Sequence, residues 1–157
     1  MFLNKKSFLY IINKTPLCSI DILVNFKNKY LFGLRENKPA LGYYFVPGGR
    51  ILKNEDYNKT ILRILNKELG LKIRKIKFSI IGIYNHFYKN NVYGVKKTNT
   101  HYFVCAIKIV LKGNITFKND NQHSKFFLLT KNQALAHKKI HRYCKSYLRR
   151  KKWKKFL

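Results

Sequence analysis

Acidic residues are scarce in this sequence. Its 157 residues include 6 Asp and Glu against 34 Lys and Arg, which gives a formal net charge of +28 at pH 7. The basic residues are scattered from Lys5 to Lys155 among many Asn and Ile, a pattern typical of AT-rich codons. Compositional drift explains it, so no specific nucleic-acid partner is expected; non-specific polyanion binding is the alternative. The one dense basic cluster, residues 141–157, predicts a helix with a solvated basic face.

Long apolar runs, paired cysteines and linkers are also absent. No apolar stretch approaches the roughly 20 residues of a membrane span, and the first residues lack a small-residue cleavage site. A cytoplasmic protein without membrane contact is therefore expected. Cys18, Cys105 and Cys144 lack metal-ligand spacing and are predicted to be buried free thiols. Without a repeat or a linker, residues 1–157 are expected to form one domain.

Local patterns predict an α+β fold with a mixed sheet. The apolar residues of 56–69 recur at helical spacing and Gly70 follows as a stop, which marks the clearest helix. A short helix is expected at 4–13, and Thr130 with Gln133 has the spacing of a capping box that starts another. Strands are predicted at 17–26 and 29–35, joined by a Lys27-Asn28 turn, and at 73–88, 100–111 and 125–129.

The informative segment is GGRILKNEDYNKTILRILNKELGL, residues 48–71, because it holds three of the six acids, Glu55, Asp56 and Glu68. A Gly-Gly turn lets backbone groups approach a ligand closely, since glycine has no side chain and tolerates unusual dihedrals. A carbonyl near Gly48 and the carboxylate of Glu68 would suit Mg²⁺, which prefers hard oxygen ligands. Helical periodicity alone requires none of these spacings.

This segment resembles the Nudix box, a loop-helix-loop that binds a divalent metal bridging a diphosphate, in the spacing of Gly49, Glu55, Arg63 and Glu68. The resemblance implies the Nudix fold, a mixed β-sheet sandwiched between helices. Two acidic positions of the box are occupied here by Ile64 and Lys67. With two ligands missing, one Mg²⁺ ion per active site is expected instead of a cluster. The same substitutions characterise GDP-mannose mannosyl hydrolases, a Nudix branch that attacks carbon instead of phosphorus.

Other segments resemble that branch in the same order over residues 1–130: MFL, TPLCSIDILV, LFGLREN, PALGYYFVPGGR, IYNHFY, THYFV and NDNQHSKF. The resemblance implies a homodimer that hydrolyses a nucleotide sugar, GDP-mannose, to GDP and mannose with inversion at the sugar carbon. Whether GDP-glucose is also a substrate is left open.

The resemblance further implies the site residues. The metal ligands would be Gly48, Glu68 and Gln122, and His123 would be the general base that takes a proton from the attacking water. The other catalytic residues would be Asp21, Arg35, Arg50, His86 and Tyr102. The substrate would contact Phe2, Leu3, Phe8, Arg35 and Arg50, with Arg63 and Glu55 as supporting residues.

Two other functions fit the same residues. The first is a standard Nudix pyrophosphohydrolase that cleaves at phosphorus, against which the substitutions Ile64 and Lys67 count. The second is a non-catalytic module that binds a nucleotide or RNA through its basic surface, against which Glu68, Gln122 and His123 count. For His86 and Tyr102, which lie in apolar strand-like runs, simple packing is the alternative role.

Overall fold

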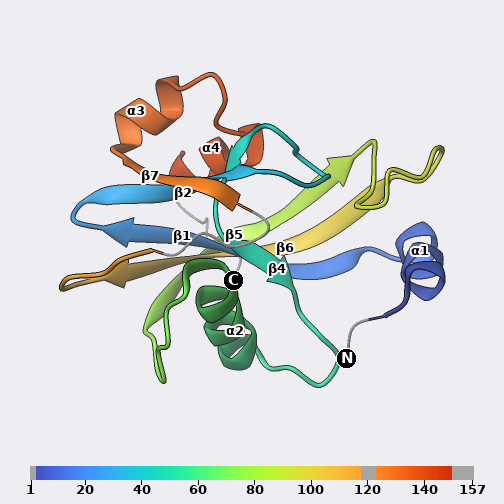
Figure 1. The fold of residues 1–157 in the computed structure, drawn as a ribbon, viewed down its shortest axis with the longest axis horizontal. Coiled ribbons are helices and arrows are strands. Elements are labelled where there is room, and N and C mark those ends of the chain that lie inside the picture. The colour runs from blue at the N-terminus through green and yellow to red at the C-terminus, as the bar shows by residue number, and fades with distance from the viewer. Residues whose placement is uncertain (1–2, 118–122, 150–157) are drawn as a thin grey trace, which may run out of the picture.

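The computed structural model describes residues 3–117 and 123–149, which form a β-sheet with helices on both faces (Figure 1). The elements follow one another as α1 (Lys5–Lys14), β1 (Leu17–Phe26), β2 (Lys29–Arg35), β3 (Tyr44–Phe45), β4 (Gly48–Arg50), α2 (Tyr57–Leu69), β5 (Phe78–Tyr88), β6 (Thr100–Leu111), β7 (His123–Leu129), α3 (Lys131–Ala136) and α4 (Arg142–Leu148).

The sheet is mixed, as predicted. Its strands run in the order β3-β2-β1-β6-β5, with β4 paired to β1 and β7 paired to β2. Strands β1 and β6 are parallel over the whole of β1, from Leu17 opposite Tyr102 to Phe26 opposite Leu111. The other described pairs are antiparallel. The α+β class is therefore confirmed.

Helices cover both faces of this sheet because the apolar side chains of its central strands point both ways. On β1, Ile22 lies in the cluster that packs under α2, while the next residue, Leu23, lies in the cluster under α3 and α4. Helix α2 contributes Ile61 and Leu65 to the first cluster, both fully buried. Figure 1 shows α2 on one side of the sheet and α3 with α4 on the other, so the predicted sandwich is confirmed.

Helices α2 and α3 begin at capping residues that the sequence shows, and α2 ends at a glycine. The side chain of Asp56 caps α2 by accepting a hydrogen bond from the Lys59 backbone N–H at 2.8 Å, and Gly70 ends the helix at φ 68°. The capping box of Thr130 and Gln133 is present at the start of α3. These local signals fix where α2 and α3 begin and where α2 ends.

The strand predicted from residue 73 begins only at Phe78. Ile73 and Ile76 do pack against the core under α2. Because they are partly buried while basic residues lie between and after them, the segment resembles a half-buried strand in sequence. The β5–β6 ladder, however, ends at Phe78 opposite Ile109, and none of the described strands pairs with residues 73–77.

One further prediction is wrong, and another holds in part. Cys18 is an exposed thiol, while Cys144 is buried as expected and Cys105 is half-buried; all three are free. Cys18 lies on the face of β1 that α2 covers, but the α2 cluster starts only at Ile20. Within 141–157, α4 forms a helix that buries Tyr147 and Leu148 instead of presenting only a solvated face. No described helix is long and apolar enough to cross a membrane.

Candidate functional site

A cavity of about 450 Å³ opens between β4, the start of β1, α1 and the loop after β5. The predicted site residues that line it come from two helices, five strands and the segment before α1: Leu3, Phe8, Asp21, Arg35, Gly48, Arg50, Arg63, Glu68, His86 and Tyr102. Residues that are up to 99 positions apart in the sequence thus share one cavity. Of the predicted residues with described side chains, only Glu55 does not line the cavity. Glu55 instead accepts hydrogen bonds from Arg63, which does line it.

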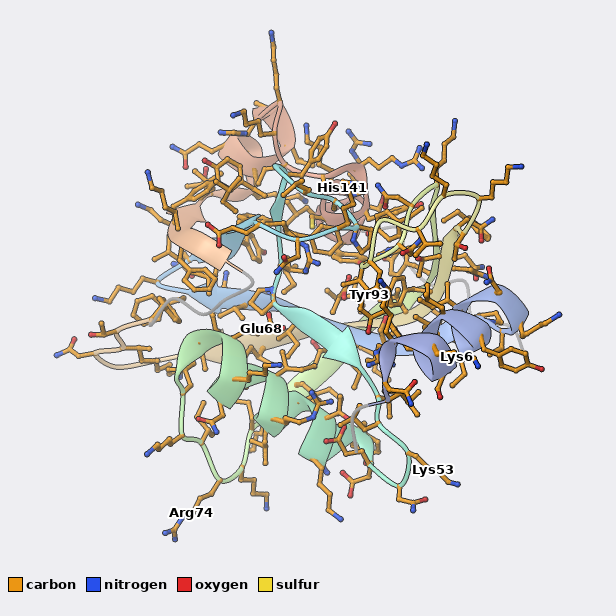
Figure 2. The ribbon with its side chains drawn as sticks, turned by 45° about the vertical axis from the view of Figure 1, so that its right-hand side comes forward. Lys6, Lys53, Glu68, Arg74, Tyr93 and His141 are labelled. Carbon is orange, nitrogen blue, oxygen red and sulfur yellow. The ribbon has the colours of Figure 1, made fainter. Side chains whose placement is uncertain are left out.

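Strand β4 brings the Gly-Gly segment against both α2 and β1. The Gly48 backbone N–H donates to Glu68 Oε2 at 3.1 Å, and Glu68 is only 2% exposed. On the other side Gly48 pairs with Asp21 of β1, and a Cβ at Gly48 would collide with the Asp21 carboxylate. The prediction of a turn here is wrong: Gly48 and Gly49 lie in a strand, and Gly48 is required for close packing. Figure 2 shows Glu68 inside the fold, whereas Lys53 and Arg74 point outward.

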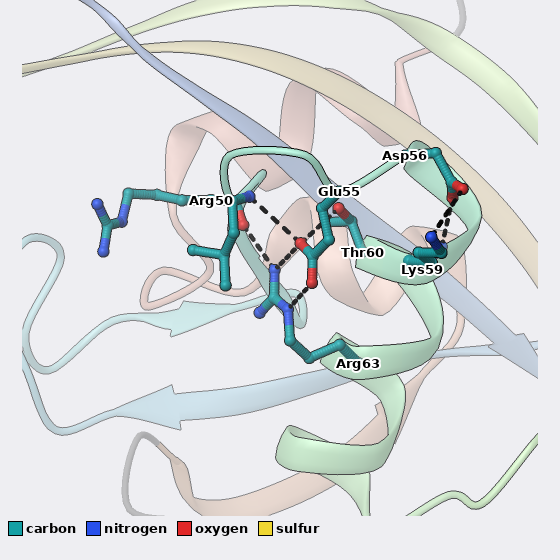
Figure 3. A network of polar contacts seen from close by, with 7 residues as sticks. Arg50, Glu55, Asp56, Lys59, Thr60 and Arg63 are labelled. Atoms are coloured by element: carbon teal, nitrogen blue, oxygen red, sulfur yellow. Dashed lines mark hydrogen bonds and ion pairs between the residues drawn. The ribbon is translucent and has the colours of Figure 1, made fainter. Parts of the chain in front are cut away.

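Glu55 and Arg63 tie the loop before α2 to the helix (Figure 3). Arg63 donates from Nε to Glu55 Oε1 at 2.6 Å, and from Nη2 to Glu55 Oε2 at 2.7 Å and to the Arg50 carbonyl oxygen at 2.8 Å. Glu55 also accepts from the Thr60 hydroxyl and the Leu52 N–H. Chiefly because of the hydrogen bonds from Arg63, the pKa of Glu55 falls to about 2. The pair therefore orders the backbone at Arg50.

Two arginines reach the cavity with charge that a phosphate could use. The Nε of Arg35 is buried and has no hydrogen-bond partner among the described residues. Such an orphaned donor costs free energy unless a ligand supplies an acceptor. The Arg50 guanidinium lies over the Phe8 ring at 4.0 Å, and burial lowers its pKa. Burial raises the pKa of Tyr102, while the positive charges of Arg35 and Arg50 act to lower it.

Asp21 and His86 are joined by a residue that the sequence did not single out, Tyr147. Its hydroxyl donates to Asp21 Oδ2 at 2.6 Å and lies 2.9 Å from His86 Nε2. Burial raises the pKa of Asp21 to about 6, against the opposing effects of Tyr147 and Arg35. Burial, with help from His141 and Arg142, lowers the pKa of His86 to about 3, so this imidazole is neutral at pH 7.

Other contributors were also missed. Tyr88 and Tyr93 line the cavity, and Tyr93 packs edge-on against Phe8 with ring centroids 6.0 Å apart. Tyr143 and Tyr147 come from the basic tail. The i, i+4 spacing of those two tyrosines, with Cys144 and Leu148 beside them, was the available signal for a buried helix face.

Three predicted residues are described in part or not at all. Phe2 and Gln122 lie outside the described residues. The backbone of His123 begins β7 and pairs with Arg35 of β2. The strand pairing thus places the predicted general base opposite Arg35, whose Nε has no hydrogen-bond partner among the described residues.

The sequence pattern of the NUDIX domain matches residues 19–149. The chain belongs to the Nudix family. Low-salt glycan biosynthesis protein Agl8 of Haloferax volcanii is 33% identical over 134 residues, covering 85% of this chain and 83% of that protein. The 8-oxo-dGTP diphosphatase of Buchnera aphidicola is 31% identical over 70 residues, covering 45% of this chain and 52% of that protein.

Solved Nudix structures share the fold. A MutT NUDIX hydrolase from Burkholderia pseudomallei superposes with a TM-score of 0.68 at 13% identity, covering 87% of this chain and 98% of that one. The NUDIX domain of Shewanella oneidensis NrtR, complexed with ADP ribose, gives a TM-score of 0.57 at 16% identity, covering 85% and 87%. At these identities the likeness establishes the fold alone.

Within this Nudix fold, the two substituted box positions differ in environment. Ile64 is 1% exposed and belongs to the core cluster under α2, whereas Lys67 is exposed. Both side chains line the cavity. Among the described residues, no group of three or more His, Cys, Asp or Glu is placed to hold a metal ion. The oxygen donors near Gly48 are therefore two buried carboxylates, Glu68 and Asp21, and backbone oxygens, and so small a set fits an ion that retains water and substrate oxygens.

Proposed function

We propose that this Nudix protein hydrolyses a nucleoside diphosphate sugar, with GDP-mannose as the first candidate, by attack of water on the sugar carbon. The observation that carries the proposal is the composition of the cavity. It combines one box carboxylate, Glu68, with a buried arginine nitrogen that lacks a partner. Two further acidic positions of the box are replaced by Ile64 and Lys67, which both line the cavity. Such a site favours holding a diphosphate as a leaving group over assembling several metal ions at phosphorus.

The arginines would bind the diphosphate. Arg35 Nε lacks an acceptor in the described fold, and a phosphate oxygen would supply a charge-assisted hydrogen bond. Arg50 carries a second positive charge held above Phe8. Arg63 is already engaged by Glu55 and the Arg50 carbonyl, so we assign it to support of the loop and not to the substrate.

Gly48, Glu68 and Gln122 would hold one Mg²⁺, which when bound would neutralise charge on the departing diphosphate. His123 would accept the proton of the attacking water, and its strand pairs with Arg35, which we assign to the diphosphate. Asp21, His86 and Tyr102 lie across the cavity, where they would contact the sugar or orient the leaving group. The relation to Agl8, whose name places it in glycan biosynthesis, is consistent with a sugar substrate.

A homodimer is part of the proposal. The edge strand β5 exposes Ile80, Ile83 and Phe87, and Phe103 of the neighbouring β6 is exposed as well. Exposed apolar side chains on a sheet edge are suited to contact with a second copy. Light scattering on the eluting protein tests this, since Phe87→Ser should shift a dimer toward monomer and the exposed Tyr10→Ser, on α1, should not.

The second candidate is a pyrophosphohydrolase that cleaves at phosphorus, favoured by the match to 8-oxo-dGTP diphosphatase. Hydrolysis of GDP-mannose with Mg²⁺ in ¹⁸O-labelled water separates the two. Label in mannose, released together with GDP, supports attack at carbon. Label in a phosphate, with GMP as product, supports the second candidate.

His123→Gln tests the general base in the same assay. It should remove most turnover and spare Mg²⁺ binding, because the base contacts water and not the ion. Near-normal turnover in this variant contradicts the assignment. Absence of turnover in the unchanged protein, with GDP still bound, would instead support a non-catalytic binding module.

A further inference from the structure

Tyr147 lies behind the cavity and touches two of its walls. Its side chain is 3% exposed and does not line the cavity, whereas its two hydrogen-bond partners, Asp21 and His86, both do. It arrives from α4, on the opposite face of the sheet from α2. A buried hydroxyl that bridges two cavity residues without facing the cavity can act on a substrate only through those residues.

The bridge fixes the direction of its hydrogen bonds. The Tyr147 hydroxyl has a single proton, and it donates this proton to Asp21 Oδ2 at 2.6 Å. The hydroxyl oxygen can then only accept from His86 Nε2, which lies 2.9 Å away. His86 must therefore carry its proton on Nε2 and have a lone pair on Nδ1.

A second tyrosine fixes the plane of the same imidazole. The Tyr143 ring stacks on His86 with centroids 3.7 Å apart and planes 4° from parallel. The Tyr143 hydroxyl accepts from the Phe87 backbone N–H at 2.8 Å and donates to the Phe87 carbonyl oxygen at 3.1 Å. Since Tyr143 and Tyr147 are four residues apart, one face of α4 controls both the ring plane and the proton position of His86.

From this geometry we infer that Tyr147 is a positioning residue for the reaction, holding His86 in the Nε2–H tautomer and fixing the Asp21 carboxylate at the cavity wall. The inference rests on the proposed function for its effect on turnover, while the tautomer belongs to the protein alone. It assigns to α4, outside the Nudix box, a share in setting up the site.

Tyr147→Phe tests the inference because it removes only the hydroxyl. Tyr84→Phe is the matched control, since its ring packs edge-on against Tyr147 at 4.9 Å and does not line the cavity. The expected result is a fall in kcat for GDP-mannose of about tenfold or more, the scale of a lost supporting hydrogen bond, with a much smaller change in KM. The control should keep the kcat of the unchanged protein.

Long-range ¹H–¹⁵N spectra of the protein without substrate at pH 8 supply the second readout. The unchanged protein and Tyr84→Phe should show His86 as Nε2–H alone, and Tyr147→Phe should show a mixture of tautomers. An Nδ1–H tautomer in the unchanged protein, or an unaltered His86 spectrum in Tyr147→Phe, overturns the inference. An altered spectrum with unchanged kcat also overturns it.

The two proposals can fail separately. If the unchanged protein releases GMP, or does not turn over GDP-mannose, the proposed function fails. The spectra still decide whether Tyr147 sets the His86 tautomer, and the kcat comparison moves to whichever nucleotide the unchanged protein hydrolyses.

Discussion

Arg63 donates two hydrogen bonds to the Glu55 carboxylate, from Nε at 2.6 Å and from Nη2 at 2.7 Å. The same Nη2 also donates to the Arg50 carbonyl oxygen. The residue at 63 therefore connects α2 to the strand that carries the glycines. The pair is mostly shielded, with 28% of the Arg63 side chain and 16% of the Glu55 side chain exposed. Its geometry depends on the planar fork of a guanidinium.

Arg63→Lys should destabilise the protein by about 1 to 3 kcal/mol, because an ammonium cannot satisfy both carboxylate oxygens and the carbonyl together. Turnover should fall as well, since the backbone at Arg50 loses its anchor. Urea unfolding measures the first effect. The exposed Arg74→Lys is the control and should change neither quantity. Equal stability of the two variants would show that the pair is dispensable.

Acid should weaken the fold through Glu55. Its pKa is about 2 in the folded protein and 4.5 ordinarily, so the unfolded chain binds the proton more readily. The stabilisation is present above about pH 4.5 and is lost as the pH falls toward 2. His86 acts in the same direction. Its pKa is about 3 in the folded protein against 6.5 ordinarily, so the unfolded chain binds the proton more readily and the fold loses stability as the pH falls below 6.5. Thermal melts of Glu55→Gln and of the unchanged protein isolate the contribution of Glu55 to the pH dependence of stability. The difference in Tm between the two proteins should shrink as the pH is lowered from 5 to 3. A constant difference contradicts it.

The neighbouring glycines of β4 should respond very differently to alanine. At Gly48 a Cβ would overlap the Asp21 carboxylate and lie 3.0 Å from the Ile20 carbonyl oxygen. At Gly49 its nearest neighbour would be Ile64 Cγ1 at 3.4 Å, an ordinary contact. Gly48→Ala should therefore cost about 1 to 3 kcal/mol and most of the activity, while Gly49→Ala changes Tm little. Calorimetry of both variants checks this, and equal effects would contradict the packing at Gly48.

Arg35→Lys should weaken GDP binding about 10- to 100-fold, the equivalent of one charged hydrogen bond. The buried Nε that lacks a partner disappears in this variant, and an ammonium cannot reproduce its direction. Titration calorimetry with GDP and Mg²⁺ gives the affinity, with Arg74→Lys as the control. Unchanged affinity would mean that the diphosphate binds elsewhere.

Glu68→Gln should weaken Mn²⁺ binding, used as a spectroscopic substitute for Mg²⁺, by about tenfold or more, because a neutral amide replaces the one box carboxylate that lines the cavity. The amide oxygen can still accept from Gly48 N–H, so Tm should change less than metal affinity does. Paramagnetic resonance of free Mn²⁺ measures the affinity. Glu36→Gln, an exposed acid, should bind Mn²⁺ like the unchanged protein.

Local patterns predicted the elements that local physics controls. Helix α2 follows from its cap, its periodicity and Gly70, and the turn between β1 and β2 from Lys27 and Asn28, which have φ of 49° and 61°. The resemblance to Nudix sequences supplied ten of the residues that line the cavity. These signals act over a few residues or are carried by a fixed spacing.

What the sequence did not reveal depends on partners distant in the chain. Tyr147 gains its role only because α4 packs against β1 and β5, and no local pattern encodes that contact. The need for glycine at 48 arises from Asp21 on another strand. Residues 73–77 were predicted to be a strand because Ile73 and Ile76 are apolar. Both pack against the core, although the described ladder begins only at Phe78. In each case tertiary packing decided the outcome.

The hydrogen bond between Tyr147 and Asp21 spans 126 positions of the chain. Closing so large a loop is entropically costly, and contacts of this length form only once most of the fold is in place. During synthesis Asp21 and the strands of the sheet emerge long before α4 does. A chain still attached to the ribosome could therefore hold a nearly complete sheet without a finished site, so onset of activity would report completed folding more faithfully than secondary structure does.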